Sequence, residues 1–192
     1  MHNYSRTTLF IDGQWVAPAG RGAIEVIDPA TERAIGSVPV GSADDVDAAV
    51  AAARTAFDPL ISPGDRRERL AAVITAMEKR LPDIAETITA EMGAPIRIAQ
   101  TVQTQVPLAV ARGFADVLDT FDPEERIGNS LVVREPYGVV AAITPWNYPL
   151  YQVVAKVLPA IAAGCTVVLK PSNEAPLSVF EFVEALDDAG LP

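Results

Sequence analysis

Two polar residues, Asn147 and Lys170, each follow a short apolar run and are separated by an apolar segment of helical length. The runs, residues 139–143 and 166–169, are typical of strands buried on both faces. Parallel strands joined by a right-handed crossover end at the same edge of a sheet, where open α/β sheets bind ligands. We therefore expect the Asn147 amide and the Lys170 ammonium to share one carboxyl edge and to form a site there.

Each of these residue types has a chemical role at such an edge. An amide donor can stabilise a developing oxyanion, a role worth about 3–4 kcal/mol. A lysine that leaves a buried strand can hydrogen bond to ribose hydroxyls or to a phosphate. Simpler interpretations stay open, because asparagine is common in turns and at helix N-caps and lysine is common on surfaces. No Gly-x-Gly-x-x-Gly motif occurs, so the usual pyrophosphate-binding loop of dinucleotide sites is not predicted.

Other kinds of catalytic site find little support in the sequence. Cys165 begins the strand that Lys170 ends, roughly 16 Å from the carboxyl edge, so we expect a buried small residue and no nucleophile. The one histidine, His2, falls in an N-terminal tail, which leaves no Ser-His or Cys-His pair. No cluster of ligands predicts a metal site. Two acidic pairs are interpreted as a helix start and a solvated turn: Asp44 with Asp45, and Glu124 with Glu125.

Composition limits the class of protein. The chain has 192 residues, 49% of them hydrophobic, which is enough for a sizeable core. The formal net charge of −10 argues against nucleic acid and anionic membranes as partners, because both require clustered Lys and Arg. There is no apolar run long enough for a membrane span and no secretory signal near the N-terminus. One cysteine cannot form an internal disulfide, so we expect a cytoplasmic location.

The first part of the chain predicts a small antiparallel lead-in followed by a helix. Alternating or apolar residues separated by turn signals form its short strands, at residues 9–16, 24–27 and 35–38. Ser42 has the spacing of a capping box at the start of a helix, and Pro63 with Gly64 is expected to break that helix.

Two further helices are expected before any parallel strand. Residues 70–88 carry apolar side chains at steps of three and four, which predicts a long helix that ends at residues 92–95. The next helix, residues 98–118, is expected to bend near Pro107. With the helix after Ser42, these helices are predicted to form one packed layer.

The pattern then changes to strands and helices in alternation. An extended segment at residues 131–135 precedes a β-α-β-α order: 139–143, 149–162, 166–169 and 175–188. The predicted fold is therefore α/β, an incomplete Rossmann-like parallel sheet preceded by the lead-in and the helical layer. Two parallel strands do not make a stable sheet, so we expect the end of the chain to interrupt a domain.

Several motifs resemble those of the aldehyde dehydrogenase superfamily, over nearly the whole chain. Residues 135–140 (EPYGVV) and 145–149 (PWNYP) are similar to the approach to that family's asparagine, and residues 169–172 (LKPS) with 175–177 (APL) are similar to its cofactor-binding segment. Upstream motifs follow in family order: residues 10–15 (FIDGQW), 28–31 (DPAT), the helix after Ser42, and 91–95 (EMGAP).

The resemblance implies an enzyme that oxidises an aldehyde to a carboxylic acid through a thiohemiacetal, with NAD or NADP as hydride acceptor. Asn147 would donate to the oxyanion, and Lys170 would bind the adenosine ribose. Other residues would line the cofactor groove: Ile143, Thr144, Pro145, Trp146, Ser172 and Asn173. Residues 127–137 resemble part of the family's oligomerisation strand, which implies a homo-oligomer.

Two features depart from the family pattern. The nucleophilic cysteine, the general-base glutamate and a second, glycine-containing cofactor loop have no counterpart here, so residues 1–192 are expected to be the incomplete N-terminal part of a cofactor-binding domain. The third residue after Lys170, often a glutamate in members that prefer NAD, is Asn173, with Glu174 next. A neutral amide does not repel a 2′-phosphate, so both NAD and NADP stay open.

We interpret the chain as the N-terminal segment of such an enzyme and predict that it is inactive alone. We prefer the interpretation that the chain is a truncated product. The other interpretation is that a separate polypeptide, which carries the cysteine half, complements it. The alternative is a non-catalytic module that binds cofactor or pairs with full-length relatives through an exposed sheet edge. The sequence does not identify the aldehyde.

Overall fold

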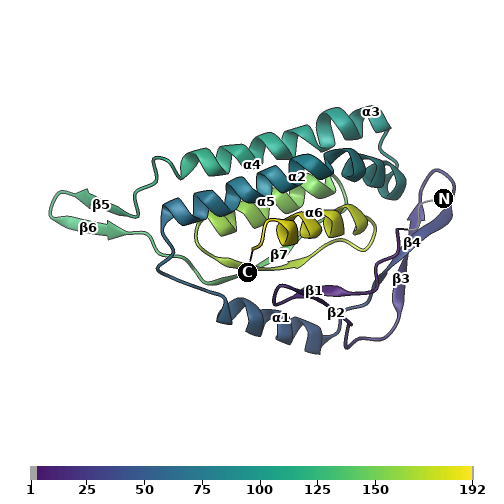
Figure 1. Cartoon of the computed structure of the whole chain (residues 1–192), viewed down its shortest axis with the longest axis horizontal. Helices are drawn as coiled ribbons and strands as arrows, with labels where there is room; N and C mark the ends of the chain where they lie inside the picture. The colour runs from purple at the N-terminus through teal and green to yellow at the C-terminus, as the bar shows by residue number, and fades with distance from the viewer. Residues whose placement is uncertain (1–3, 192) are drawn as a thin grey trace.

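The computed structural model describes residues 4–191, so the prediction for His2 lies outside the described residues. The architecture is α/β, as the sequence predicts, with helices stacked over a short parallel sheet and a hairpin that extends from one end (Figure 1). Within residues 4–191, no helix is both long and apolar enough to cross a membrane.

The antiparallel lead-in is confirmed. Strands β1 (Leu9–Ile11) and β2 (Gln14–Val16) form one hairpin, and β3 (Ala23–Asp28) and β4 (Arg33–Pro39) form another. The backbone of residues 4–6 adds to β4, because Arg6 N–H donates to the Ser37 carbonyl at 2.7 Å. These strands lie beside the helices, and Val26 and Val38 form a small second apolar cluster with Leu177, at the start of the last helix.

Helix α1 (Ala43–Thr55) begins with the predicted capping box: Ser42 Oγ accepts from the backbone of Asp45, whose carboxylate accepts from the Ser42 backbone. Asp45 also accepts from the backbone of Ala19 at 2.8 Å, which ties the lead-in to this helix. These bonds, the one from Ala19 first, lower the pKa of Asp45 to about 2.

The single helical layer predicted for the first three helices is wrong. Helix α1 contacts β7 and β8, on the side opposite α5 (Figure 1), whereas α2 (Pro63–Met92) and α4 (Gln105–Val117) pack on α5. The connection of seven residues after Thr55 is long enough to carry the chain from one face of the sheet to the other. Pro63 and Gly64 do not break α1; they open α2, where Pro occupies a first-turn position that has no N–H to satisfy.

Helix α2 is the centre of the core. All eight residues of its predicted apolar stripe are buried: Leu70, Val73, Ile74, Met77, Leu81, Ile84, Ala85 and Ile88. Gly93 ends the helix in the left-handed conformation at φ 78°. Their partners come mainly from α4, α5 and α6.

The irregularity of the next helical segment lies earlier than predicted. A short turn, α3 (Ile96–Ile98), leads into a π-helical stretch, η1 (Ala99–Gln103), before α4 begins. The buried Thr104 hydroxyl bonds to the carbonyls of Ala99 and Gln100, which supports the wider turn. Pro107 falls in the first turn of α4, where its missing N–H breaks little of the hydrogen-bond ladder.

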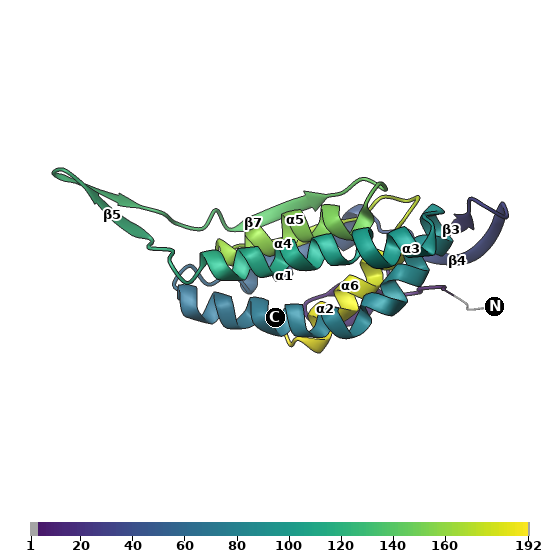
Figure 2. The same cartoon turned by 90° about the horizontal axis from the view of Figure 1, so that it is seen from above.

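Strands β5 (Glu124–Ile127) and β6 (Ser130–Val133) form a hairpin that extends from the body in both views (Figures 1 and 2). Every residue in both strands is exposed. Glu124 and Glu125 therefore lie in a strand and not in the predicted turn, although they are solvated as expected.

The predicted crossover is confirmed. Strand β7 (Val139–Ile143), helix α5 (Pro149–Ala162) and strand β8 (Thr166–Lys170) form a parallel pair with a covering helix, and α6 (Leu177–Asp188) follows. The strands are not buried on both faces, because only Ala142 of β7 is fully covered and Ile143 is 69% exposed. For α6 the sequence predicts an apolar face of Leu177, Phe180, Val183 and Leu186. Leu177 is fully buried as predicted, but the other three are only partly buried, and Val179, Phe182 and Ala185 are buried more deeply.

Two glycines that follow helices allow a matched test of packing. Gly164 (φ 82°) and Gly190 (φ 68°) are both left-handed. A Cβ at Gly190 meets nothing within 4 Å, whereas one at Gly164 would lie 2.8 Å from Arg66 Cζ. Arg66 is buried and bonded to the carbonyls of Ile61 and Ala162, so it has little freedom to move.

We expect Gly190→Ala to lower the free energy of unfolding by about 1 kcal/mol, from backbone strain alone. Gly164→Ala should cost about 1–3 kcal/mol more, because overpacking is added to the same strain. Urea denaturation of both variants measures the difference. Equal losses in the free energy of unfolding would show that Arg66 moves to make room for the added methyl group.

Candidate active-site edge

The carboxyl ends of β7 and β8 lie side by side, which confirms the arrangement that places Asn147 and Lys170 at one edge of the sheet. Ile143 pairs with Lys170 in the parallel register, and the Thr144 N–H donates to the Lys170 carbonyl at 3.2 Å. We call residues 143–148 and 170–174 the carboxyl edge. Its backbone is fixed by the sheet on one side and by helices α5 and α6 on the other.

Asn147 is exposed, and its side chain makes no hydrogen bond to any other described residue. It is not the helix N-cap: that position belongs to Tyr148, which has left-handed backbone angles (φ 54°, ψ 54°) and makes no side-chain cap. Such angles are uncommon for a bulky residue and concentrate at functional sites. The sharp turn at Tyr148 leaves the Asn147 amide free to donate.

Lys170 is held by its neighbours and is not a freely moving surface lysine. Its ammonium donates to the Pro171 carbonyl at 2.7 Å and to Asn173 Oδ1 at 3.2 Å, and the residue is exposed at the end of β8. The ammonium has three N–H donors, so one remains for a ligand. With its Oδ1 engaged, Asn173 presents its amide N–H groups outward.

Glu174 is turned away from this contact. Its carboxylate accepts a short hydrogen bond from Ser172 Oγ, which also accepts from the Glu174 N–H at 3.3 Å. The hydrogen bond from Ser172 is the main reason that the pKa of Glu174 is lowered. The carboxylate of Glu174, the anion next to Lys170 in the sequence, is therefore hydrogen bonded within its own turn.

The β7 side of the carboxyl edge combines one buried hydroxyl with exposed apolar side chains. Thr144 is 4% exposed, and its hydroxyl has no hydrogen-bond partner within residues 4–191. Trp146 and Tyr148 are about half exposed, at 53% and 47%. An unsatisfied buried hydroxyl at a sheet end is costly, so it indicates a place where a ligand or further chain can donate or accept.

The carboxyl edge is open and is not a closed pocket. Two hollows in the described surface lie elsewhere, one of about 630 Å³ between α2 and α6 and one of about 380 Å³ at the base of the β5–β6 hairpin. Cys165 is buried immediately before β8, at the strand end opposite Lys170, as predicted. No group of three or more His, Cys and acidic residues suited to a metal occurs in the described part of the chain.

A model of the aldehyde dehydrogenase family matches residues 15–192. The chain belongs to the aldehyde dehydrogenase family. It is 48% identical over 192 residues to a 3-succinoylsemialdehyde-pyridine dehydrogenase of a Pseudomonas species, a match that covers 96% of this chain and 39% of that protein. The family resemblance inferred from the motifs is thereby confirmed.

Solved structures of aldehyde dehydrogenases have the same fold. A mutant of aldehyde dehydrogenase C from Pseudomonas syringae, in complex with NAD+ and octanal, superposes with a TM-score of 0.94 at 46% identity and covers 97% of this chain. The Mycobacterium tuberculosis aldehyde dehydrogenase in complex with NAD+ has a TM-score of 0.94 at 40% identity over 100% of this chain. This chain spans 39% and 41% of the length of those two structures.

One contact of this aldehyde dehydrogenase chain escaped the sequence reasoning. Glu91, in the last turn of α2, is 3% exposed and accepts from the backbone of Leu177 at 2.6 Å and of Ser178 at 3.0 Å, at the start of α6. Burial raises the pKa of Glu91 to about 7, against the effect of these hydrogen bonds. The available signal was an acid on the buried side of an apolar helix, but its partner is 86 residues away.

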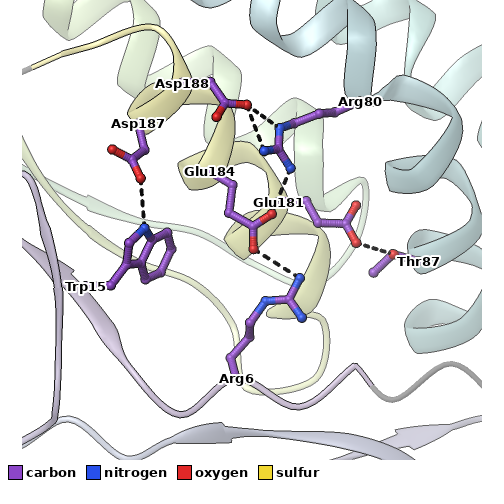
Figure 3. A network of polar contacts seen from close by, with 8 residues as sticks. All are labelled: Arg6, Trp15, Arg80, Thr87, Glu181, Glu184, Asp187 and Asp188. Atoms are coloured by element: carbon purple, nitrogen blue, oxygen red, sulfur yellow. Dashed lines mark hydrogen bonds and ion pairs between the residues drawn. The ribbon is translucent and has the colours of Figure 1, made fainter.

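The remainder of α6 is held by a polar network drawn in Figure 3. Arg80 of α2 binds Glu184 and Asp188, and Arg6 also binds Glu184. The buried Glu181 accepts from Thr87 at 2.5 Å, and its pKa is raised, chiefly by burial.

Proposed function

We propose that this chain supplies the cofactor side and the oxyanion side of an NAD(P)-dependent aldehyde dehydrogenase that oxidises an aldehyde to a carboxylic acid. The observation that carries the proposal is the carboxyl edge. There an unpaired Asn147 amide lies in the loop after β7, and a positioned Lys170 ammonium ends the adjacent parallel strand β8. Both relatives of known structure described above contain NAD+, and one contains an aldehyde.

In this proposal Asn147 donates to the oxygen of the aldehyde as it becomes an oxyanion, and Lys170 donates to a ribose hydroxyl. NAD(P)+, when bound, accepts the hydride. The carboxyl edge fits this group, because Lys170 keeps a free donor and the Thr144 hydroxyl lacks a partner in the described chain. The backbone from Ile143 to Trp146, with Ser172, would line the groove.

The same geometry supports use of NADP as well as NAD. Asn173 faces the lysine with its oxygen and leaves two N–H donors for a hydroxyl or phosphate oxygen. The nearby carboxylate of Glu174 is occupied by Ser172. Position 173 itself therefore carries no anion to repel a 2′-phosphate. The neighbouring Glu174 stays ionised, because the hydrogen bond from Ser172 and the charge of Lys170 lower its pKa.

The test is a titration of the isotopically labelled 192-residue chain with NAD+ and NADP+, followed by NMR. Amide shifts should concentrate at the carboxyl edge, and Lys170→Met should weaken binding about tenfold or more. Lys156→Met is the matched control, since Lys156 bonds to Gln152 within α5 and should leave binding unchanged. Equal effects of the two variants, or shifts confined to other surfaces, would count against the assignment.

We predict that the 192-residue chain alone does not oxidise aldehydes, because its one thiol is buried at the strand end away from the carboxyl edge. The measurement is NAD(P)H absorbance with an aldehyde panel at high protein concentration. Aldehyde-dependent reduction that survives Cys165→Ala would overturn this prediction.

A second candidate function is association without catalysis. The β5–β6 hairpin projects with exposed apolar side chains at Ile127 and at three consecutive positions, 131–133. Within residues 4–191, β7 and β8 are each paired on one edge only. We propose that residues 127–137 contribute to a homo-oligomer or to pairing with full-length relatives. Light scattering with and without a full-length relative distinguishes these partners, and a monomer under both conditions would exclude the association.

A further inference from the structure

Helix α6 lacks a local N-cap. The N-cap position is Pro176, and no side chain within the turn bonds to the first amides of the helix. Uncapped N-terminal amides are costly when buried, and both Leu177 and Ser178 are fully buried. The helix therefore needs an acceptor from elsewhere in the fold.

Glu91 supplies that acceptor from α2. Each of its carboxylate oxygens takes one amide, Oε2 from Leu177 and Oε1 from Ser178. A carboxylate at a helix N-terminus also interacts favourably with the helix dipole. The contact uses both carboxylate oxygens and is buried, so it fixes the direction in which α6 begins.

The six residues between the two anchors are the cofactor segment, residues 171–176. Strand β8 fixes one end at Lys170 through its register with β7, and Glu91 fixes the other end at Leu177. Ala175 is buried against the fold, so the segment has little room to move near α6. The positions of Ser172 and Asn173 thus depend on both anchors.

We infer that Glu91 is a positioning residue for cofactor binding: its carboxylate holds the first turn of α6 and thereby sets the geometry of residues 171–176. The inference rests on the proposed function, since it assigns the segment to the cofactor. Glu91 acts through the backbone and touches no substrate. The body of α6 stays in place without it, because Arg80, Thr87 and Arg6 hold Glu184, Glu181 and Asp188.

That independence provides a matched control. Glu181 is also a buried acid between α2 and α6, but it bonds to Thr87 and not to the helix N-terminus. Glu91→Gln and Glu181→Gln remove one buried acid each and keep the side-chain size. Gln at position 91 retains one acceptor oxygen, whereas Glu91→Ala retains none.

The experiment measures hydrogen exchange and NAD+ affinity on the full chain and the three variants. We expect exchange at residues 171–178 to become about tenfold faster in Glu91→Gln and faster still in Glu91→Ala, with the rest of α6 unchanged. The dissociation constant for NAD+ should rise about tenfold in Glu91→Gln. Glu181→Gln leaves both hydrogen bonds of Glu91 in place and should alter neither quantity. It removes a charge that raises the pKa of Glu91 and can therefore alter stability.

A loosening spread over all of α6, or an equal response to Glu181→Gln, would overturn the inference. If the variants do not fold, a pH titration of the unmodified chain still decides: the Leu177 and Ser178 amide protons must shift with the ionisation of Glu91, and a flat response would exclude the contact. If the chain binds no NAD+ or NADP+, the proposed function fails, while the exchange data still report whether Glu91 positions the segment.

Discussion

Phe182→Ala is expected to lower the free energy of unfolding by about 3–5 kcal/mol. Phe182 is fully buried and lies in the main core with residues of α2, α4 and α5. Truncation removes most of an aromatic side chain and leaves a cavity that rigid neighbouring helices cannot close. This would be the largest loss from a single substitution in α6.

Urea denaturation followed by circular dichroism measures the loss. Leu60→Ala is the control, because Leu60 is 89% exposed and its truncation should change stability by less than about 0.5 kcal/mol. A loss below about 1 kcal/mol for Phe182→Ala would mean that α6 is not packed as described.

The second large effect is a pH dependence that originates at Glu91. Burial, together with the smaller effect of the negative charge of Glu181 on α6, raises its pKa to about 7 from 4.5 in the unfolded chain. A raised pKa means that the folded state binds the proton more tightly. The resulting stabilisation is complete below about pH 4.5 and is lost as the pH rises through about 7.

The native chain should therefore lose about 2–3 kcal/mol relative to Glu91→Gln between about pH 5 and about pH 8. The comparison cancels other titrating groups, including Glu181, because both chains contain them. Denaturation curves at several pH values supply the measurement. Parallel stability profiles for the two chains would contradict a raised pKa at Glu91.

These two effects have different meanings for the fold. Phe182 contributes stability that any well-packed core requires. Ionised Glu91 lowers global stability at neutral pH and yet orients the first turn of α6. A buried acid that lowers stability but holds a helix end in place is better explained by a functional need for that geometry than by a need for stability.

Local patterns were sufficient for most elements. The apolar stripe of α2, its end at Gly93 and the capping box at Ser42 depend on neighbours within a few residues, and each is confirmed. The errors arose where local signals competed. The sequence predicts a bend near Pro107, but the irregularity is the π-helical stretch before α4, which the buried Thr104 supports.

The face of α6 shows the same limit. Its spacing predicts a stripe through Leu177, Phe180, Val183 and Leu186, but packing on α2 and α5 buries Val179, Phe182 and Ala185 more deeply than the last three. The layer assignment failed for a related reason, because the side of the sheet on which α1 lies is decided by the path of a loop. The periodicity of residues within a helix predicts neither the side of the sheet on which α1 lies nor the face that α6 buries.

The sequence by itself determined the α/β class, the β-α-β crossover and the placement of Asn147 and Lys170 at one edge, because right-handed crossovers leave a single arrangement for those strands. Only the tertiary structure decided that Asn173 faces Lys170, that Tyr148 turns through left-handed angles, and that Glu91 caps α6. The first two are local, but residue spacing does not specify a side-chain rotamer or a left-handed backbone. The third joins residues 86 positions apart, which only the packing of α2 on α6 brings together.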